Sequence, residues 1–302
     1  MIFNTLLIGL GNIGLLYDFQ SKNIQTHSKA ITLNKNFKLV GAIEPKEARR
    51  VIFLNKFKIK PFSKIKKDLV LKSKLIVISS TTSSLFNNLT KVININPKLN
   101  ILIEKPFGFT EKEISYIKKK FKNNKIYINY YRNFDKKNLL LKKIIFNKLK
   151  GPFNGSLNYN KGFFHNCSHF LALFLFFFGK IKKVQIVDKI KIKNDYYIKA
   201  IIYYNNFELL ISPSVKNIDC SFKIFGKKGK LNYDNDGSSI YYTLFNKMGI
   251  FKSKRIKFLN NISNYQKEVY ENIYKDLLNK KSKVFDKKQI LELNKEIKKF
   301  KL

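Results

Sequence analysis

The chain has 302 residues, 44% of them hydrophobic and 15% aromatic, so it can bury a sizeable core and does not have the composition of a disordered protein. Its formal net charge of +40 would suit a polyanionic partner. However, only four of its 60 basic residues are arginine, the residue favoured for bidentate binding of phosphates and bases. The lysines are also spread along the whole chain, so we expect no specific nucleic-acid partner.

The cysteines and the apolar runs indicate the cellular setting. Cys167 and Cys220 have neither metal-ligand nor disulfide spacing, which fits a reducing compartment. The apolar N-terminus lacks a basic leader region and runs into a glycine motif. The most apolar run, 170–178, is far shorter than the roughly 20 residues that span a bilayer. We therefore expect a soluble cytoplasmic protein without a membrane partner.

The first predicted element is a strand at 2–8, which opens directly into the motif GLGNIG at 9–14. In such a motif the first glycine permits a tight turn, the second lets a pyrophosphate approach the backbone, and the third allows close helix–strand packing. The phosphates would then lie on the amide groups at the start of a helix. An ordinary glycine turn in an α/β protein is the alternative. The motif predicts a dinucleotide bound by Gly9, Gly11, Asn12, Ile13 and Gly14.

The second predicted strand, 37–44, ends in Glu44. A carboxylate at this place accepts hydrogen bonds from the adenosine ribose and repels a 2′-phosphate, which favours NAD over NADP. NADP remains an alternative because Lys46, Arg49 and Arg50 follow closely. The acid lies further from the glycine motif than the usual 20 or so residues, and we interpret the segment SKNIQTHSKA at 21–30 as an insertion in the first crossover.

Strands and helices continue to alternate as far as residue 129, which predicts an α/β domain over 1–129 with a doubly wound parallel (Rossmann) sheet. Ligands bind such sheets at the carboxyl ends of the strands. The loops that follow the strands at 73–80 and 101–103 lie at that edge. They add Ser80, Thr81, Thr82, Glu104, Lys105 and Pro106 to the predicted cofactor site. Further elements are expected as helices at 46–57, 85–93 and 111–122 and as a strand at 125–129.

The second predicted domain, 130–302, has a different pattern and is expected to be α+β with a mainly antiparallel sheet. Its short predicted strands are separated by turn residues. Helices are expected at 135–149, 166–178, 262–281 and 286–300, and strands at 184–193, 196–204, 207–212, 219–226, 229–234 and 239–245.

The stretches GLGNIG, EKP, NYYRNFD and NCSHF occur in an order that resembles the glucose–fructose oxidoreductase and inositol dehydrogenase (Gfo/Idh/MocA) family of NAD(P)-dependent oxidoreductases. FGKKGKLNYD and NYQKEVYENIY extend the resemblance over nearly the whole chain. THSKA, NYYR and HNCSH look most like members that act on sugars in surface-polysaccharide and glycan pathways. The resemblance implies a nucleotide domain, a substrate domain with an open-faced sheet, and homo-oligomers packed through that sheet.

The sequence also departs from the family pattern. Thr81 and Leu85 stand where members often carry a proline and a histidine. His165 replaces an aspartate that many members carry four residues before the catalytic histidine, here His169. Ala172 replaces an aspartate three residues after it. These changes put the proton relay in doubt more than the cofactor site.

Hydride transfer between a nicotinamide and a sugar carbon requires a proton to move to or from the carbinol oxygen. Lys105 could hydrogen-bond that hydroxyl and stabilise a developing alkoxide, although a lysine-rich chain also has many merely solvated lysines. His169 is the preferred base. His165 lies on the same helical face and is expected to play a partial catalytic role. This histidine pair has no third ligand in the sequence, so we expect no metal.

Three remaining polar residues receive weaker assignments. Arg132 and Asn166 are expected to bind substrate, with packing at the domain boundary as the alternative for Arg132. His27 is expected to structure the insertion. The sequence thus favours an NAD(P)-dependent oxidoreductase acting on a sugar or nucleotide sugar. A catalytically decayed nucleotide-binding protein and a polyanion-binding protein are the alternatives.

Overall fold

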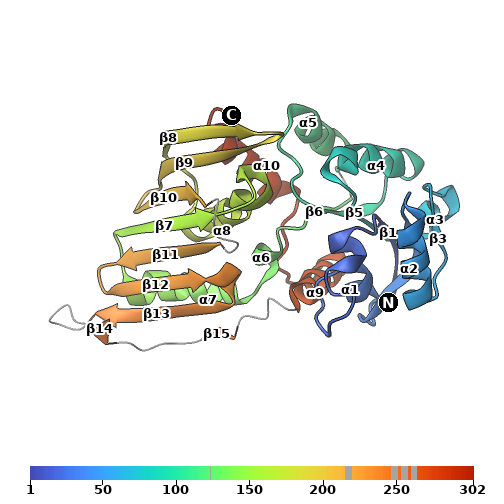
Figure 1. The fold of residues 1–302 in the computed structure, drawn as a ribbon, viewed down its shortest axis with the longest axis horizontal. Helices are drawn as coiled ribbons and strands as arrows, with labels where there is room; N and C mark the ends of the chain where they lie inside the picture. Colours follow the sequence, from blue (N-terminus) through green and yellow to red (C-terminus); the bar gives the residue numbers. More distant parts are fainter. Residues whose placement is uncertain (123, 215–219, 246–250, 253–257, 260–263) are drawn as a thin grey trace. The chain divides into compact units, whose positions relative to one another are not determined.

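The structure is a computed structural model that describes residues 1–122, 124–214, 220–245, 251–252, 258–259 and 264–302 (Figure 1). It contains two compact units. The first combines Met1–Asp135 with Ser263–Leu291, and the second combines Lys136–Ile262 with Glu292–Leu302. The expected domains, 1–129 and 130–302, meet at a single boundary in the sequence. In the structure, the late segment Ser263–Leu291 belongs to the first unit.

The first unit is built on a six-stranded parallel sheet with the order β3-β2-β1-β4-β5-β6. The chain starts in the middle of the sheet, builds outward to one edge, and then builds to the other edge from β4, which confirms the predicted doubly wound topology. The short edge strand β3 was not predicted. The strands are β1 (Phe3–Ile8), β2 (Phe37–Ile43), β3 (Pro61–Phe62), β4 (Leu75–Ile78), β5 (Asn100–Ile103) and β6 (Ile126–Ile128).

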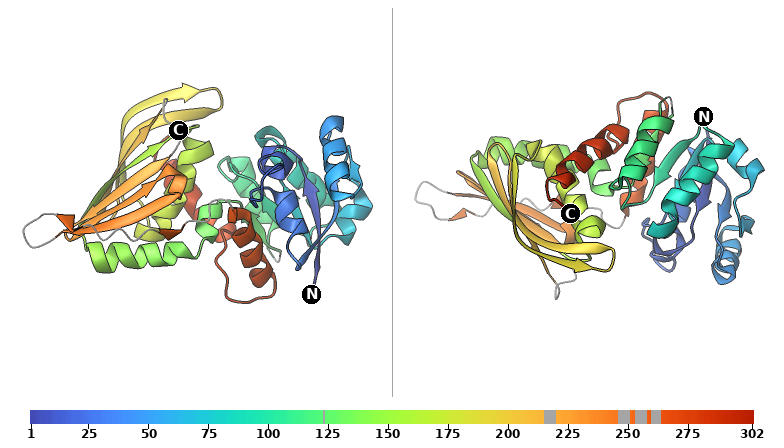
Figure 2. Two further views of the ribbon diagram at one scale, coloured as in Figure 1. Left: turned by 60° about the horizontal axis from the view of Figure 1, so that its bottom comes forward. Right: turned by 90° about the horizontal axis from the view of Figure 1, so that it is seen from above.

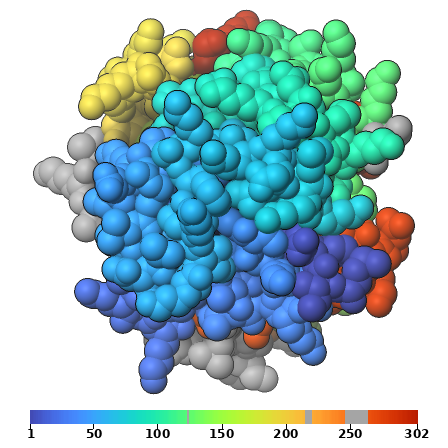
Figure 3. Space-filling model, turned by 90° about the vertical axis from the view of Figure 1, so that its right-hand side faces the viewer, coloured from blue at the N-terminus to red at the C-terminus, as the bar shows by residue number. Residues whose placement is uncertain are grey.

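Helices cover both faces of this sheet, as Figures 1 and 2 show. The apolar runs of β4 and β5 are buried along their whole length, as expected for parallel strands covered on both faces. In Figure 3 the surface of the unit is formed mostly by blue and cyan segments that include α2, α3 and α4. The helices are α1 (His27–Thr32), α2 (Glu47–Phe57), α3 (Lys67–Lys72), α4 (Thr82–Ile95), α5 (Glu111–Lys120), α6 (Tyr131–Phe134) and α9 (Tyr265–Leu277).

The first crossover is not a single helix. After the glycine motif the chain forms one π-helical turn, η1 (Asn12–Leu16), then a loop, and then α1. The buried Asp18 organises the loop, since its carboxylate accepts hydrogen bonds from the backbone N–H groups of Gln25 at 2.6 Å and Thr26 at 2.9 Å. The segment interpreted as an insertion at 21–30 is therefore an ordered loop that leads into a short helix.

The second unit is built on a sheet with the order β14-β13-β12-β11-β7-β10-β9-β8, and β15 also pairs with β13. Its pairs are antiparallel except that of β7 with β10, which confirms the expectation of a mainly antiparallel sheet. The strands are β7 (Phe153–Tyr159), β8 (Lys183–Ile192), β9 (Asp195–Tyr203), β10 (Phe207–Pro213), β11 (Ser221–Gly226), β12 (Gly229–Asp234), β13 (Ser239–Phe245), β14 (Phe251–Lys252) and β15 (Phe258–Leu259).

Helix α8 (Ser168–Phe178) lies on one face of this sheet (Figure 1), and its aromatic rings pack against those of the strands. The ring of Phe174 lies 5.7 Å from that of Phe207 and 5.2 Å from that of Phe222. The turn η3 (Phe163–Cys167) runs straight into this helix. The other helical segments that the structure describes are α7 (Lys137–Lys143), η2 (Ile144–Leu149), η4 (Asn235–Gly237) and α10 (Lys287–Lys298).

Some predicted element ends lie outside the described residues, namely residue 219 of a predicted strand and residues 262 and 263 of a predicted helix. Among the residues that the structure does describe, no helix has both the length and the apolar character needed to cross a bilayer.

Candidate functional site

The glycine motif forms a tight turn between β1 and η1 at the carboxyl edge of the first sheet. Gly9 has φ +102°, and a Cβ there would lie 2.6 Å from the backbone of Ser79 and Ser80. The Ser79 hydroxyl donates a 2.8 Å hydrogen bond to the Gly9 carbonyl, which ties the turn to the end of β4. A Cβ at Gly14 would collide with the same carbonyl. Both positions therefore require glycine for close backbone approach.

Gly11 has a different environment, because the nearest atom to a Cβ there is Nη1 of Arg49, at 3.7 Å. Its carbonyl accepts the N–H groups of Leu15 and Leu16, so the helical turn begins at this residue. The first N–H groups of a helical turn, here those of Asn12 and Ile13, have no intrahelical acceptor. Open space, amide groups and a guanidinium group meet here, and this combination fits a pyrophosphate.

Glu44 follows β2 and is held against the glycine turn. Its Oε2 accepts the N–H of Leu10 at 2.8 Å and its Oε1 accepts the N–H of Lys46 at 3.0 Å. Nη1 of Arg49 lies 3.8 Å from Oε2. Arg50 instead donates to the Glu44 carbonyl at 2.9 Å. The carboxylate is thus fixed at the place where an acid binds the ribose of a dinucleotide, and the residues present fit NAD.

The hydroxyl groups after β4 are engaged with α4. Thr81 is the N-cap residue of this helix, and its Oγ1 lies 3.0 Å from the hydroxyl of Ser84. The Ser80 hydroxyl accepts a 3.0 Å hydrogen bond from Asn88. Leu85, at the place of the family's histidine, is buried in the core. The predicted cofactor-binding segment runs from Ser80 to Thr82. Within it, the backbone of Ser80 lies against the glycine turn.

Glu104 follows β5, and its carboxylate joins a buried network. Oε1 lies 2.8 Å from Nε2 of His27 and also accepts the side-chain amide of Asn129. Nδ1 of His27 lies 2.9 Å from the hydroxyl of Tyr270. Burial, and next the nearby Glu104 charge, raise the pKa of Tyr270 well above its usual value, so this phenol stays neutral. The half-buried Lys105 comes next in the chain, before a cis peptide bond to Pro106.

This network assigns His27 a wider role than structuring the insertion. With an ionised carboxylate, which only accepts hydrogen bonds, and a neutral imidazole, Nε2 of His27 donates to Glu104 and Nδ1 accepts from Tyr270. The ring thereby links α1, the loop after β5 and α9. Asn129 and Tyr270 were not singled out from the sequence. The position of Asn129 at the end of β6 is a signal that could have found it, because the carboxyl ends of parallel strands share one edge.

Arg132 lies in α6 and is buried, with 5% of its surface exposed. Its guanidinium carbon lies 4.7 Å from the ring centroid of Tyr131, which in turn stacks on Tyr265 at 4.3 Å. Both contacts lie within the first unit. Substrate binding by Arg132 and its alternative, packing at the domain boundary, both remain predictions.

His165 lies in η3 of the second unit and contacts an acid that the sequence analysis missed. Its Nδ1 lies 2.6 Å from Oδ2 of Asp195, the first residue of β9. The His165 side chain is 44% exposed and that of Asp195 is 10% exposed. No local motif marks this pair, because the two residues are 30 positions apart and the fold alone brings them together.

His169 and Asn166 lie on either side of the start of α8. His169 is buried, with 1% of its surface exposed. The Asn166 amide donates to the side-chain oxygen of Asn160 at 2.6 Å and to the Cys220 sulfur at 3.1 Å. Asn166 is half-buried, and its predicted contact with substrate remains a prediction.

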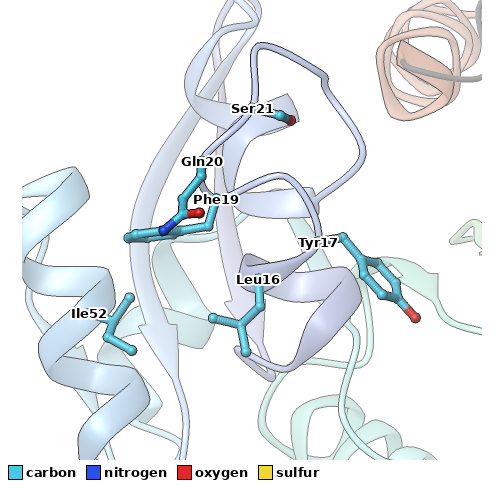
Figure 4. Close-up of a pocket in the computed structure, with 6 residues that line it drawn as sticks. All are labelled: Leu16, Tyr17, Phe19, Gln20, Ser21 and Ile52. Atoms are coloured by element: carbon cyan, nitrogen blue, oxygen red, sulfur yellow. The ribbon is translucent and has the colours of Figure 1, made fainter.

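Features outside these residues add little to the site. No cluster of three or more metal-binding side chains occurs among the described residues. An open hollow of about 450 Å³ lies in the first crossover, where Leu16, Phe19 and Ile52 come close together while the Tyr17 side chain points away (Figure 4). None of the predicted site residues lines it.

Comparison with known proteins agrees with this geometry. Residues 3–131 match the oxidoreductase family with an NAD-binding Rossmann fold. No curated protein sequence matches the chain. The fold is similar to that of an NAD-binding oxidoreductase from Klebsiella pneumoniae, at 13% identity and a TM-score of 0.76, with 99% of this chain and 96% of that chain covered.

Two further solved structures are similar. The dehydrogenase MviM from Clostridium difficile has 16% identity and a TM-score of 0.74, over 99% of this chain and 98% of that chain. An oxidoreductase from Agrobacterium radiobacter in complex with NAD⁺, L-tartaric acid and magnesium has 12% identity and a TM-score of 0.73, over 99% and 95%. At these identities the likeness shows a shared fold. The family match covers residues 3–131, the part of the chain that forms the six-stranded parallel sheet.

Proposed function

We propose that this protein is an NAD-dependent oxidoreductase that interconverts a hydroxyl and a keto group on a sugar or nucleotide sugar. The observation that carries the proposal is Lys105. It follows a carboxylate, Glu104, that His27 and Asn129 hold in place at the same sheet edge as the glycine turn. A lysine at the carboxyl edge of a dinucleotide-binding sheet is suited to contact the group that reacts.

When bound, NAD supplies the two-electron chemistry, since its nicotinamide accepts or gives a hydride. Gly9, Gly11, Asn12, Ile13 and Gly14 would hold the pyrophosphate. Glu44 would hold the ribose, and the loops at Ser80–Thr82 and Glu104–Pro106 would complete the site.

The protein's own part in the reaction is to handle the proton of the substrate hydroxyl. The ammonium group of Lys105 would hydrogen-bond the hydroxyl and stabilise negative charge that develops on its oxygen. An imidazole, either His165 or His169, would take or return the proton. Arg132 and Asn166 would orient the substrate.

Support for a sugar substrate comes from the sequence stretches that resemble sugar-acting members of the family, and from the complex of a protein of similar fold with L-tartaric acid, a small polyhydroxylated acid. Support for NAD over NADP comes from the fixed carboxylate of Glu44. Bound NADP would have to displace the Glu44 carboxylate or place its 2′-phosphate beside that negative charge.

We also propose a cytoplasmic homo-oligomer that packs through the second sheet. Its edge strand β8 exposes the apolar side chains of Ile186, Val187 and Ile190 to solvent. Contiguous exposed apolar groups of this kind favour association. Light scattering of a β8 variant with these three residues replaced by threonine tests the proposal.

Turnover assays test the main proposal. The wild type should reduce NAD⁺ in the presence of at least one free hexose or nucleotide sugar. Lys105→Met should lower kcat/KM by about 10²–10⁴-fold, the usual contribution of a positioned acid or base, and should leave the dissociation constant of NADH unchanged. The matched control is Lys98→Met, which removes an exposed lysine before β5.

Two outcomes would count against the proposal. Full activity of Lys105→Met would reject the role of the lysine. NADH binding without turnover of any sugar would favour the alternative of a decayed nucleotide-binding protein, for which the replaced relay residues His165, Ala172 and Leu85 provide the motive.

A further inference from the structure

We propose that the stacked rings of Tyr131 and Tyr265 bind the C–H face of a pyranose substrate, and that Tyr265 determines the affinity for this sugar. The inference rests on the proposed function, because it names the surface that recognises the substrate of the same reaction. It involves only residues of the first compact unit.

The stack lies at the carboxyl edge of the parallel sheet, in the neighbourhood of Lys105. Strands β5 and β6 pair in parallel and end opposite each other. Lys105 is the second residue after β5, and Tyr131 is the third residue after β6. The side-chain amide of Asn129 joins the two loops, since it donates to the carboxylate of Glu104. The tyrosine stack therefore shares its sheet edge with the lysine assigned to the reacting hydroxyl.

The protein fixes the stack through contacts at both of its ends. The ring centroids of Tyr131 and Tyr265 lie 4.3 Å apart, with an angle of 30° between the ring planes. The guanidinium carbon of the buried Arg132 lies 4.7 Å from the Tyr131 centroid. The residues on either side of Tyr265 bond to the N–H and the carbonyl of Ile24, at 2.9 Å and 3.4 Å. A surface that is ordered in advance loses little entropy when a ligand binds.

The exposed part of the stack suits the shape of a sugar ring. Both tyrosines are half-buried, so part of each side chain reaches solvent. The face of an aromatic ring carries negative electrostatic potential. A pyranose presents weakly positive C–H groups on its faces, whereas its hydroxyl groups project from the rim. The sugar can therefore lie against the tyrosines and keep its hydroxyl groups available for polar partners.

The hydroxyl group of Tyr265 offers one such partner. Burial raises the pKa of Tyr265 above its ordinary value, and nearby groups that include Tyr131 and Glu104 raise it further, so the phenol stays neutral. A neutral phenol both donates and accepts hydrogen bonds. Among the residues that the structure describes, this hydroxyl has no hydrogen-bond partner. A hydroxyl group on the rim of the sugar would supply the missing partner.

The simpler role of the stack is packing, because it joins the start of α6 to the start of α9. A stack that only packs contributes to stability and has no effect that is specific to the sugar. A stack that binds the sugar changes the KM for that sugar and leaves the dissociation constant of NADH unchanged. The two roles are therefore separable by experiment.

The first measurement is turnover by the full-length protein with NAD⁺ and the hexose or nucleotide sugar that the wild type oxidises. Tyr265→Leu should raise the KM for the sugar by about 2–10-fold, the range that corresponds to the usual strength of an aromatic pair. The value of kcat should change little, because the contact is the same in the ground state and the transition state. Tyr265→Phe keeps the ring and should restore most of the affinity.

Tyr116→Leu is the matched control for this substitution. Tyr116 is also half-buried, lies on α5 of the same unit and pairs with another aromatic ring, that of Phe86, at 5.3 Å. Its loss removes a comparable aromatic contact outside the loops that follow β5 and β6. This variant should keep the wild-type KM for the sugar.

The second measurement detects sugar binding without turnover. It uses saturation-transfer NMR on the NADH complex of full-length protein that is deuterated except at its 16 tyrosine rings. The probes are D-glucose, D-galactose, D-mannose and UDP-glucose. Irradiation of the tyrosine protons should transfer saturation to the C–H protons of at least one of these sugars. In the same background, Tyr265→Phe carries a deuterated ring at this position and should lose most of the transfer while the stack is kept.

Several outcomes would overturn the inference and leave the proposed function standing. One is an unchanged sugar KM in Tyr265→Leu. Another is a higher dissociation constant of NADH in that variant, with the fold intact by circular dichroism, which would assign the ring to the cofactor. Equal saturation transfer in wild type and Tyr265→Phe, or transfer to none of the four probes, would also overturn it, and this test does not depend on the folding of Tyr265→Leu. Transfer that Tyr265→Phe abolishes, without turnover of any sugar, would support the surface and reject the proposed function.

Discussion

The described part of the structure shows a histidine–carboxylate pair in each compact unit, with similar contacts and opposite surroundings. His27 Nε2 lies 2.8 Å from Glu104, and His165 Nδ1 lies 2.6 Å from Asp195. The side chain of His27 is fully buried, whereas that of His165 is 44% exposed. The contacts are alike, so the difference in function has to come from what surrounds each ring.

In the buried pair both ring nitrogens have protein partners. Nε2 is bonded to Glu104 and Nδ1 to the hydroxyl of Tyr270, so the ring connects three segments and has no nitrogen left for a substrate. Such a pair stabilises the loop that carries Lys105. In the second pair Nδ1 contacts the carboxylate, and the side chain is 44% exposed. We infer that the first pair anchors the loop after β5 and that the second holds the turn η3 against β9.

The largest effect that would test this comparison is a loss of stability in His27→Leu. Removing one partner leaves the buried Glu104 charge short of a hydrogen bond, so the free energy of unfolding should fall by about 3–5 kcal/mol. His165→Leu, at an exposed position, should change it by about 1 kcal/mol or less. Equilibrium unfolding in urea, followed by circular dichroism, measures both. Equal losses in the two variants would remove the distinction between the pairs.

A smaller effect is expected from the hydroxyl of Tyr270. Tyr270→Phe should lower the free energy of unfolding by about 1–2 kcal/mol, because Nδ1 of His27 is left buried without its donor. Tyr274→Phe on the same helix is a matched control. Both rings pack on Phe37, but the Tyr274 hydroxyl makes an exposed 3.3 Å contact with the Met1 carbonyl. Similar losses in both variants would show that ring packing, and not the His27 contact, is measured.

The comparison also shows where sequence reasoning succeeds. Sequence reasoning found the strand at 2–8, the glycine motif and the apolar runs before Ser79 and Glu104. It could do so because hydrophobic periodicity and composition reflect burial directly. From these runs the parallel sheet and the position of Lys105 at its edge followed. Strand β7 was missed, since its sequence FNGSLNY mixes glycine and polar residues with few apolar positions.

The partners of both histidines could not be found in this way. Tyr270 is 243 positions from His27, and Asp195 is 30 positions from His165. Neither hydrophobic periodicity nor motif spacing identifies residues that come together only through tertiary packing. The sequence did indicate that His165 departs from the family pattern, but it gave no sign of the acid that contacts it.

The smallest expected effect concerns the acid dependence of the second pair. Hydrogen bonds hold the pKa of folded Asp195 below its ordinary value of 3.8. A carboxyl with a depressed folded pKa contributes stability above its unfolded pKa and loses it as the pH falls towards the folded value. Asp195→Asn should therefore unfold at a lower temperature than the wild type at about pH 5, and the difference should shrink towards about pH 3.

Thermal unfolding at the two pH values measures this difference, and comparison within each pH cancels the repulsion that acid adds to a chain of net charge +40. Asp68→Asn, which removes an exposed carboxylate from α3, should give a small difference that does not change with pH in this way. If the Asp195→Asn difference stays constant between the two pH values, the carboxylate's charge is not what stabilises the loop. The pair would then hold His165 through hydrogen-bond geometry alone.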